Sequence, residues 1–233
     1  MYGHEQSYQT QVTLTTTSGF FPKVYGWMTA GLALTALSAF LTLSSQSLLN
    51  LVFSNRLVFY GLIIGELGLV FTMSAAINRI SAMTATMMFL LYSALNGVTF
   101  ASIFLLYTSS SIASTFMIAA GTFAVMSGYG YATKRDLTGW GSFLFMGLIG
   151  VIIASVVNIF LHSAMITWVT SYLGVFIFVG LTAYDTQKIK MIGRNGFADS
   201  ESRHKTAILG ALALYLDFIN LFLMLLRIMG NRR

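Results

Sequence analysis

The sequence predicts an all-α membrane protein, a bundle of seven transmembrane helices. Hydrophobic residues make up 56% of the 233 residues and charged residues only 9%, against about 25% charged in ordinary soluble domains. Seven apolar runs are long enough to cross about 30 Å of hydrocarbon, which takes about 20 helical residues. These runs leave almost no chain for a soluble domain, so we expect residues 24–233 to form a single transmembrane domain.

The segment before the first run, residues 1–23, is polar and rich in threonine. It lacks the basic start and the early apolar stretch of a cleaved signal peptide, and it is poor in arginine, unlike a mitochondrial transit peptide. We therefore expect a flexible tail, followed by a first membrane helix that acts as an uncleaved signal anchor.

The breaks between apolar runs set the predicted spans. A break as short as "HS" indicates an antiparallel hairpin, and no span should carry a proline kink because Pro22 is the only proline. In the second span, Gly61 and Gly65 have the GxxxG spacing that lets helices pack closely. The predicted spans are Val24 to Ser45, Leu57 to Ile77, Ala82 to Leu106, Ile112 to Thr133, Gly141 to Leu161, Ala164 to Asp185 and Ala207 to Met229.

The basic residues predict the orientation of the chain. All 13 Lys and Arg lie in the breaks or near the ends of the spans. They form no basic face, so the net charge of +6 does not indicate a nucleic-acid partner. Nine of them fall on the side of the N-terminus and four on the other side. Because cytoplasmic loops carry the excess of Lys and Arg, we expect the N-terminus in the cytoplasm and the C-terminus outside.

Three acidic residues lie inside or at the edge of a span. They are Glu66 in the second span, Asp185 at the end of the sixth and Asp217 in the middle of the seventh. An ionisable group at this depth costs a few kcal/mol, so it is rare unless it faces a polar interior. Asn220 follows Asp217 by three residues on the same helix face. We therefore expect Glu66 and Asn220 to line an ion pathway. Asp185 has a simpler alternative, because Lys188 lies one turn after it on the same helix and could pair with it locally.

Two segments carry a family resemblance. "GLTAYDTQKIK" and "LGALALYLDFINLFLMLLRIMGNRR", on a seven-span chain of this length, resemble the Bax inhibitor-1 family, also called the transmembrane BAX inhibitor motif or lifeguard family. The resemblance runs from "VYGWM" through the last span and is strongest to bacterial inner-membrane members. It implies that Asp185 and Asp217 form a pH-sensing latch on a calcium leak pathway in the bacterial inner membrane. An arginine after the second span bonds to this pair in the family, and Arg79 is the candidate here.

Elementary chemistry fits that role for the two aspartates. Two carboxyl groups in a low-dielectric site do not readily hold two negative charges, so they share a proton. When both are ionised they are hard oxygen ligands of the kind that Ca²⁺ takes, so both are possible calcium contacts. Calcium would be the transported ion, and we expect no resident cofactor. Asp217 lies twelve residues from Lys205, about 18 Å along a helix. The last helix should therefore begin well outside the membrane, at "ESRHK", or a water-filled vestibule should open there.

Two other function classes compete with a leak pathway. The first is a membrane regulatory protein that binds and restrains a membrane protease or a stress- or death-pathway partner without transport. Calcium flux through the purified chain in liposomes would separate the two. The second is an intramembrane aspartyl protease, of which "AYD" matches one motif. The other motif, Gly-x-Gly-Asp, is replaced by "YLD", so we expect no enzyme.

Overall fold

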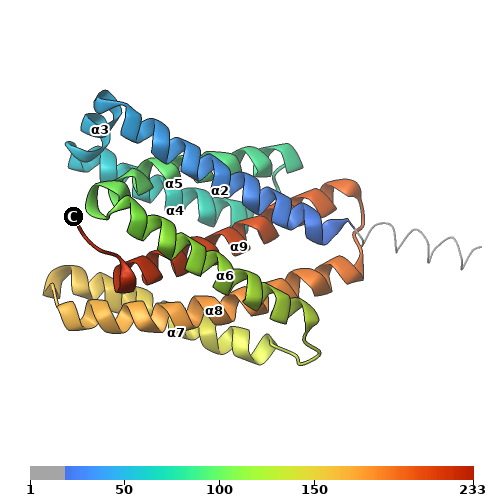
Figure 1. Cartoon of the computed structure of the whole chain (residues 1–233). Helices are drawn as coiled ribbons and strands as arrows, with labels where there is room; N and C mark the ends of the chain where they lie inside the picture. Colours follow the sequence, from blue (N-terminus) through green and yellow to red (C-terminus); the bar gives the residue numbers. More distant parts are fainter. Residues whose placement is uncertain (1–18) are drawn as a thin grey trace, which may run out of the picture. The chain divides into compact units, whose positions relative to one another are not determined.

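Eight helices account for most of residues 19–233 (Figure 1). The structure, a computed structural model, describes residues 19–233. Seven of the helices are long and apolar enough to cross a membrane, which confirms the predicted all-α polytopic fold. The helices are α2 (Phe20–Ser44), α3 (Gln46–Phe53), α4 (Arg56–Ala76), α5 (Ala82–Leu106), α6 (Ser109–Ala132), α7 (Thr138–Leu161), α8 (Ala164–Asn195) and α9 (Ser200–Met229).

The observed helix ends differ from the predicted spans at several points, including α7, which begins three residues early at Thr138. α2 begins at Phe20, so the last residues of the predicted tail are helical, while residues 1–18 lie outside the described part of the chain. The short helix α3 was not predicted, because its eight residues are too few to give a clear period. Its start is fixed by Ser45, whose hydroxyl accepts a hydrogen bond from the Leu48 amide at 3.4 Å. α6 begins three residues early, at Ser109.

The last two helices are longer than a membrane crossing requires. α8 has 32 residues and α9 has 30, which correspond to about 48 and 45 Å at 1.5 Å per residue. Both exceed the roughly 30 Å of hydrocarbon in a bilayer. α9 begins at Ser200, seven residues before the predicted span, so the helix includes "ESRHK"; whether these residues stand outside the membrane stays a prediction. Between the two helices, Gly196 has a φ of +77°, a conformation that glycine adopts without strain.

The chain divides into two compact units. The first comprises the described residues up to Ile103 together with Met191–Leu212, and the second comprises Phe104–Lys190 and Ala213–Arg233. α8 and α9 therefore each contribute residues to both units.

In the first unit, α5 packs closely on α2. The Thr35 hydroxyl donates a hydrogen bond to the Ser93 carbonyl oxygen at 2.9 Å. Gly97 faces the Thr35 carbonyl group so closely that a Cβ atom would overlap it. By contrast, Gly61 and Gly65 in α4 have open space where a Cβ would stand. The prediction that this GxxxG pair mediates close packing is therefore wrong for the described chain.

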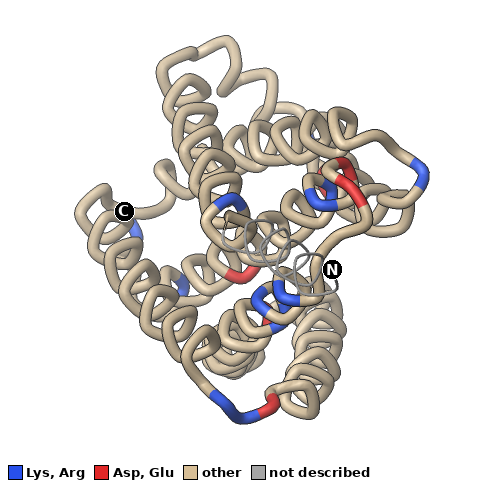
Figure 2. Tube along the Cα trace, turned by 90° about the vertical axis from the view of Figure 1, so that its right-hand side faces the viewer, with Lys and Arg blue, Asp and Glu red and all other residues tan. Residues whose placement is uncertain are grey.

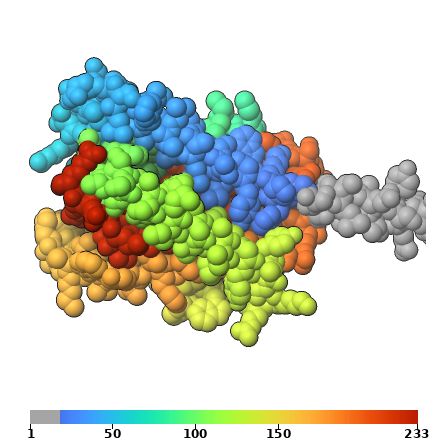
Figure 3. Space-filling view, viewed as in Figure 1, coloured from blue at the N-terminus to red at the C-terminus, as the bar shows by residue number. Residues whose placement is uncertain are grey.

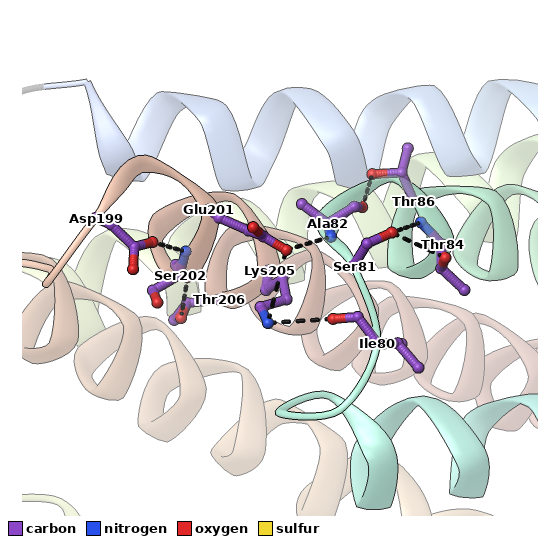
Figure 4. Close-up of polar contacts among 10 residues, drawn as sticks. All are labelled: Ile80, Ser81, Ala82, Thr84, Thr86, Asp199, Glu201, Ser202, Lys205 and Thr206. Carbon is purple, nitrogen blue, oxygen red and sulfur yellow. Dashed lines mark hydrogen bonds and ion pairs between the residues drawn. The ribbon is translucent and has the colours of Figure 1, made fainter.

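The start of α9 is tied to the turn before α5, also within the first unit (Figure 4). Lys205 donates to the Ile80 carbonyl oxygen at 3.1 Å, and Glu201 accepts from the Ala82 amide at 3.3 Å. Lys205 and Glu201 also form an ion pair at 3.9 Å, one turn apart on the helix. Asp199 caps the helix by accepting from the Ser202 amide at 2.6 Å. These contacts order the first turns of α9.

In the second unit, α7, α8 and α9 share an apolar core. Its buried members include Leu144 of α7, Phe178 and Leu181 of α8 and Leu221 of α9. α6 lies against α8 at Gly130, where a Cβ atom would overlap the backbone of Ala183. The absence of a side chain at Gly130 therefore allows α6 to approach α8 closely at Ala183, which is two residues before Asp185.

Candidate functional site

Asp185 of α8 and Asp217 of α9 face one another in the second unit. Their side chains are hydrogen-bonded to each other. Asp217 is 4% exposed, and Asp185 is half-buried. Because an ionised carboxylate can only accept hydrogen bonds, a bond between two carboxyl groups requires a proton on one of them. This bond between α8 and α9 can therefore form only when at least one of the two carboxyl groups is protonated.

The surroundings of Asp217 are apolar. Its Oδ2 atom has no hydrogen-bond partner within residues 19–233, which costs about 1–3 kcal/mol for a buried polar atom. The next residue, Phe218, packs edge-on against Phe116 and Phe123 of α6, with ring centroids 5.4 and 5.5 Å away. Leu214 and Leu221 are fully buried, one turn away on either side. Asp217 thus has Asp185 as its polar partner and hydrocarbon around the rest.

Lys188 does not neutralise Asp185 directly. The described chain contains no ion pair between them, and the Lys188 Nζ lies 5.9 Å from the centroid of the Tyr184 ring. The charge of Lys188 acts on Asp185 without a direct contact between the two side chains. The side chain to which Asp185 is hydrogen-bonded is that of Asp217.

Several neutral contacts hold the turn of α8 that carries Asp185. Gln187 donates to the Arg135 carbonyl oxygen at 2.7 Å and accepts from the Leu137 amide at 2.9 Å. The Thr186 hydroxyl donates to the Ser127 hydroxyl of α6 at 3.4 Å. These positioning residues were not predicted. One indication of them in the sequence is Gln187 itself, a polar side chain two residues after Asp185 at the end of an apolar run.

Glu66, in the first unit, is a buried acid of a different kind. It is 8% exposed. Its Oε1 accepts from the Thr99 hydroxyl at 2.5 Å, and its Oε2 accepts from the Asn96 amide at 3.4 Å. The same amide donates to the Tyr92 hydroxyl at 3.2 Å. Both carboxylate oxygens thus have neutral donors from α5, and the place of Glu66 in an ion pathway stays a prediction.

The two remaining predicted site residues show no contact that assigns them a function. Asn220 is half-buried, and its amide donates to the Leu216 carbonyl oxygen of its own helix at 2.8 Å. Arg79 is exposed in the turn after α4. It belongs to the first unit and the aspartate pair to the second. Both roles stay predictions.

The acidic residues do not gather into a metal cluster. Within residues 19–233 no group of three or more His, Cys, Asp or Glu side chains could hold a metal ion. Two ionised aspartates offer up to four carboxylate oxygens, whereas Ca²⁺ takes six to eight oxygens. Water or backbone carbonyl groups would have to supply the rest. Calcium contacts at the pair stay a prediction.

Comparison with known proteins places this geometry in a family. Residues 17–233 match the family model described as "Inhibitor of apoptosis-promoting Bax1". The inner membrane protein YbhL of Escherichia coli strain K12 is 56% identical over 215 residues, covering 92% of each chain. A protein of Borreliella burgdorferi is 51% identical over 214 residues, again covering 92% of each. Protein RP147 of Rickettsia prowazekii is 43% identical over 233 residues, covering 95% of this chain and 97% of its own.

Proposed function

The chain belongs to the Bax inhibitor-1 family of membrane proteins, and we propose that it is a pH-sensitive calcium leak pathway gated by Asp185 and Asp217. The observation that carries the proposal is the hydrogen bond between these two buried acids. Such a bond exists only while a proton is shared, so its strength follows the proton concentration. The similarity to the inner membrane protein YbhL supports a multi-pass location in a bacterial inner membrane.

The gate works through the number of protons on the pair. With one proton, the two carboxyl groups bond and hold α8 against α9. Loss of that proton leaves two negative charges facing each other in an apolar setting, where charge repulsion is strong. The repulsion separates the two helices in this part of the second unit. The same two ionised carboxylates attract a divalent cation.

The test is calcium flux through the purified full chain in liposomes that contain a calcium-sensitive dye. Flux should be low at pH 5 and should rise as the pH is raised to 8. Liposomes without protein give the background leak, and the variant Asp136→Asn gives a control for loss of an acid outside the pair. A flux that does not vary with pH would contradict the gate. Absence of flux would contradict the leak function and favour a regulatory protein that acts by binding a membrane partner.

A further inference from the structure

A cavity of about 330 Å³ lies in the second unit between α6, α7 and α8. Its walls include Tyr129 of α6, Trp140 of α7, and Phe176, Val179 and Ala183 of α8. Arg135 and Asp136 border it from the loop between α6 and α7. In Figure 2 this loop carries adjacent basic and acidic residues, and in Figure 3 its side chains stand out from the surface. The cavity is therefore apolar along the helices and charged at the loop.

The distance along α8 from the level of the loop to Phe176 corresponds to one leaflet of a bilayer. Gln187 holds the loop by its bonds to Arg135 and Leu137, and Phe176 lies eleven residues before Gln187 on the same helix. Eleven helical residues span about 16 Å, roughly half of the 30 Å hydrocarbon thickness. An acyl chain that starts at the level of the loop can therefore lie along the cavity as far as Phe176.

The charges at the loop favour a phosphate group. The Asp136 Oδ1 atom accepts from the amide and from the hydroxyl of Thr138, at 2.9 and 2.7 Å, so this carboxylate is directed at the first turn of α7. Arg135 and Lys134 are both exposed, and neither takes part in an ion pair within residues 19–233. Of the two, only Arg135 lines the cavity, so the loop presents one cation to the cavity, beside an acid that already caps a helix.

Trp140 marks the level of the membrane interface. It is 59% exposed and lines the cavity within the first turn of α7. Tryptophan is enriched where headgroups meet the hydrocarbon. Basic pockets between transmembrane helices at this level bind acidic lipid headgroups. A free phosphate would leave the apolar wall at Phe176 and Val179 unused, so the occupant needs an acyl chain as well as a negative charge.

We propose that this cavity binds an acidic glycerophospholipid. One acyl chain lies against Phe176 and Val179, and the Arg135 guanidinium binds the phosphate, a charge-assisted contact that can be bidentate. Ala183, which is two residues before Asp185, lines the cavity and also contacts Gly130. The bound lipid therefore touches the helix that carries the gate, but its binding does not depend on calcium transport.

The test is native mass spectrometry of the delipidated full chain titrated with phosphatidylglycerol or with phosphatidylethanolamine of the same acyl chains. We expect one phosphatidylglycerol to be retained and phosphatidylethanolamine to be retained more weakly. Arg135→Gln should weaken phosphatidylglycerol binding about tenfold, which corresponds to about 1.4 kcal/mol. Lys134→Gln is the matched control, because it removes the same charge one residue away from the cavity and should change binding less than twofold.

A second variant tests the acyl chain separately. Val179→Phe fills the wall of the cavity without changing the charge of the loop, and it should also lower phosphatidylglycerol retention. Three outcomes would overturn the proposal. They are unchanged binding by Arg135→Gln, equal losses from Arg135→Gln and Lys134→Gln, and equal retention of the two lipids by the unaltered chain. The last would indicate ordinary surrounding lipid only. None of these outcomes bears on calcium flux, so the two proposals stand or fall separately.

Discussion

The two units each bury a carboxyl site, and the two sites are satisfied in opposite ways. In the first unit, Glu66 receives hydrogen bonds from Thr99 and Asn96, neutral donors whose bonding does not require a proton on the acid. In the second unit, Asp217 bonds to another acid, and one of its oxygens has no partner in the described chain. The first arrangement keeps its bonds when the acid is ionised, and the second loses its bond. Burial of an acid alone therefore does not make a switch.

The largest effect is expected from neutralising the aspartate pair. In Asp185→Asn or Asp217→Asn, the new amide donates to the remaining carboxyl whether or not that group is ionised. Both single variants should therefore lose the rise of calcium flux with pH. The double variant should resemble one of the single variants, because groups that share one proton are not independent. Effects on the gating free energy that add within about 0.5 kcal/mol would mean that the two sites are unconnected.

The next effect concerns the glycine contacts beside the two sites. Gly130→Ala should lower the free energy of unfolding by about 1–3 kcal/mol, because the new Cβ overlaps the backbone of Ala183. It should also shift the pH midpoint of flux, since α8 carries Asp185. Gly97→Ala in the first unit should destabilise similarly through its overlap with Thr35, but without a shift in midpoint. Thermal unfolding in detergent and liposome flux measure the two quantities.

Gly128→Ala serves as the matched control for that experiment. Gly128 lies in the same helix as Gly130, and a Cβ atom there would meet nothing within 4 Å. Alanine is favoured over glycine in a helix by about 1 kcal/mol, so this variant should be at least as stable as the unaltered chain. A loss of stability equal to that of Gly130→Ala would show that the close approach to Ala183 is not the cause.

A smaller effect is expected from Glu66→Gln. The glutamine side chain has one acceptor oxygen where glutamate has two, so one bond to Thr99 or Asn96 is lost. That loss should cost about 1 kcal/mol of stability, measured by unfolding in detergent. If Glu66 lines the pathway, calcium flux should fall while its pH midpoint stays fixed. Unchanged flux would leave Glu66 with a structural role. A shift in the pH midpoint of flux would mean that Glu66 also acts as a switch, which contradicts the difference drawn between Glu66 and the aspartate pair.

The smallest effect concerns an exposed acid, Asp199, outside the spans. Its hydrogen bonds from the backbone and side chain of Ser202 lower the pKa of this carboxyl below its ordinary value. The resulting stabilisation is present above the unfolded pKa, about 3.9, and is lost as the pH falls through the lower folded pKa. Asp199→Asn should therefore lower the unfolding temperature slightly at pH 7 and by less at pH 3. A difference that is the same at both pH values would contradict this origin.

The sequence was sufficient for the fold because burial in lipid leaves a strong signal. Seven apolar runs gave seven long helices, with ends shifted by a few residues except in α8 and α9. The ten residues of α8 beyond Asp185 were missed because "TQKIKMIGRN" is polar enough to leave the membrane while remaining a good helix former. Hydropathy records where a helix leaves lipid, and it does not record where the helix ends.

The candidate site was only partly predictable. Glu66, Asp185 and Asp217 were singled out because a carboxyl group in an apolar run is costly, and the family resemblance then implied the pair of Asp185 and Asp217. The supporting contacts of Gln187 and Gly130 depend on which helix packs on which face, and a single sequence does not contain that information. For the same reason Gly61 and Gly65 were given a contact that the described chain lacks. The expected orientation of the termini also stays a prediction, because charge bias is its only support.

The short connection between α8 and α9 has a consequence for the biogenesis of the protein. A helix that enters the membrane with a lone aspartate at its centre faces a penalty of about 2.5–3.5 kcal/mol on insertion scales. Asp217 is in α9, and its partner Asp185 is in α8, the helix made just before it. If the two helices enter together as one hairpin, each aspartate meets the other before it meets lipid. The pairing that holds the gate would then also ease the entry of α9.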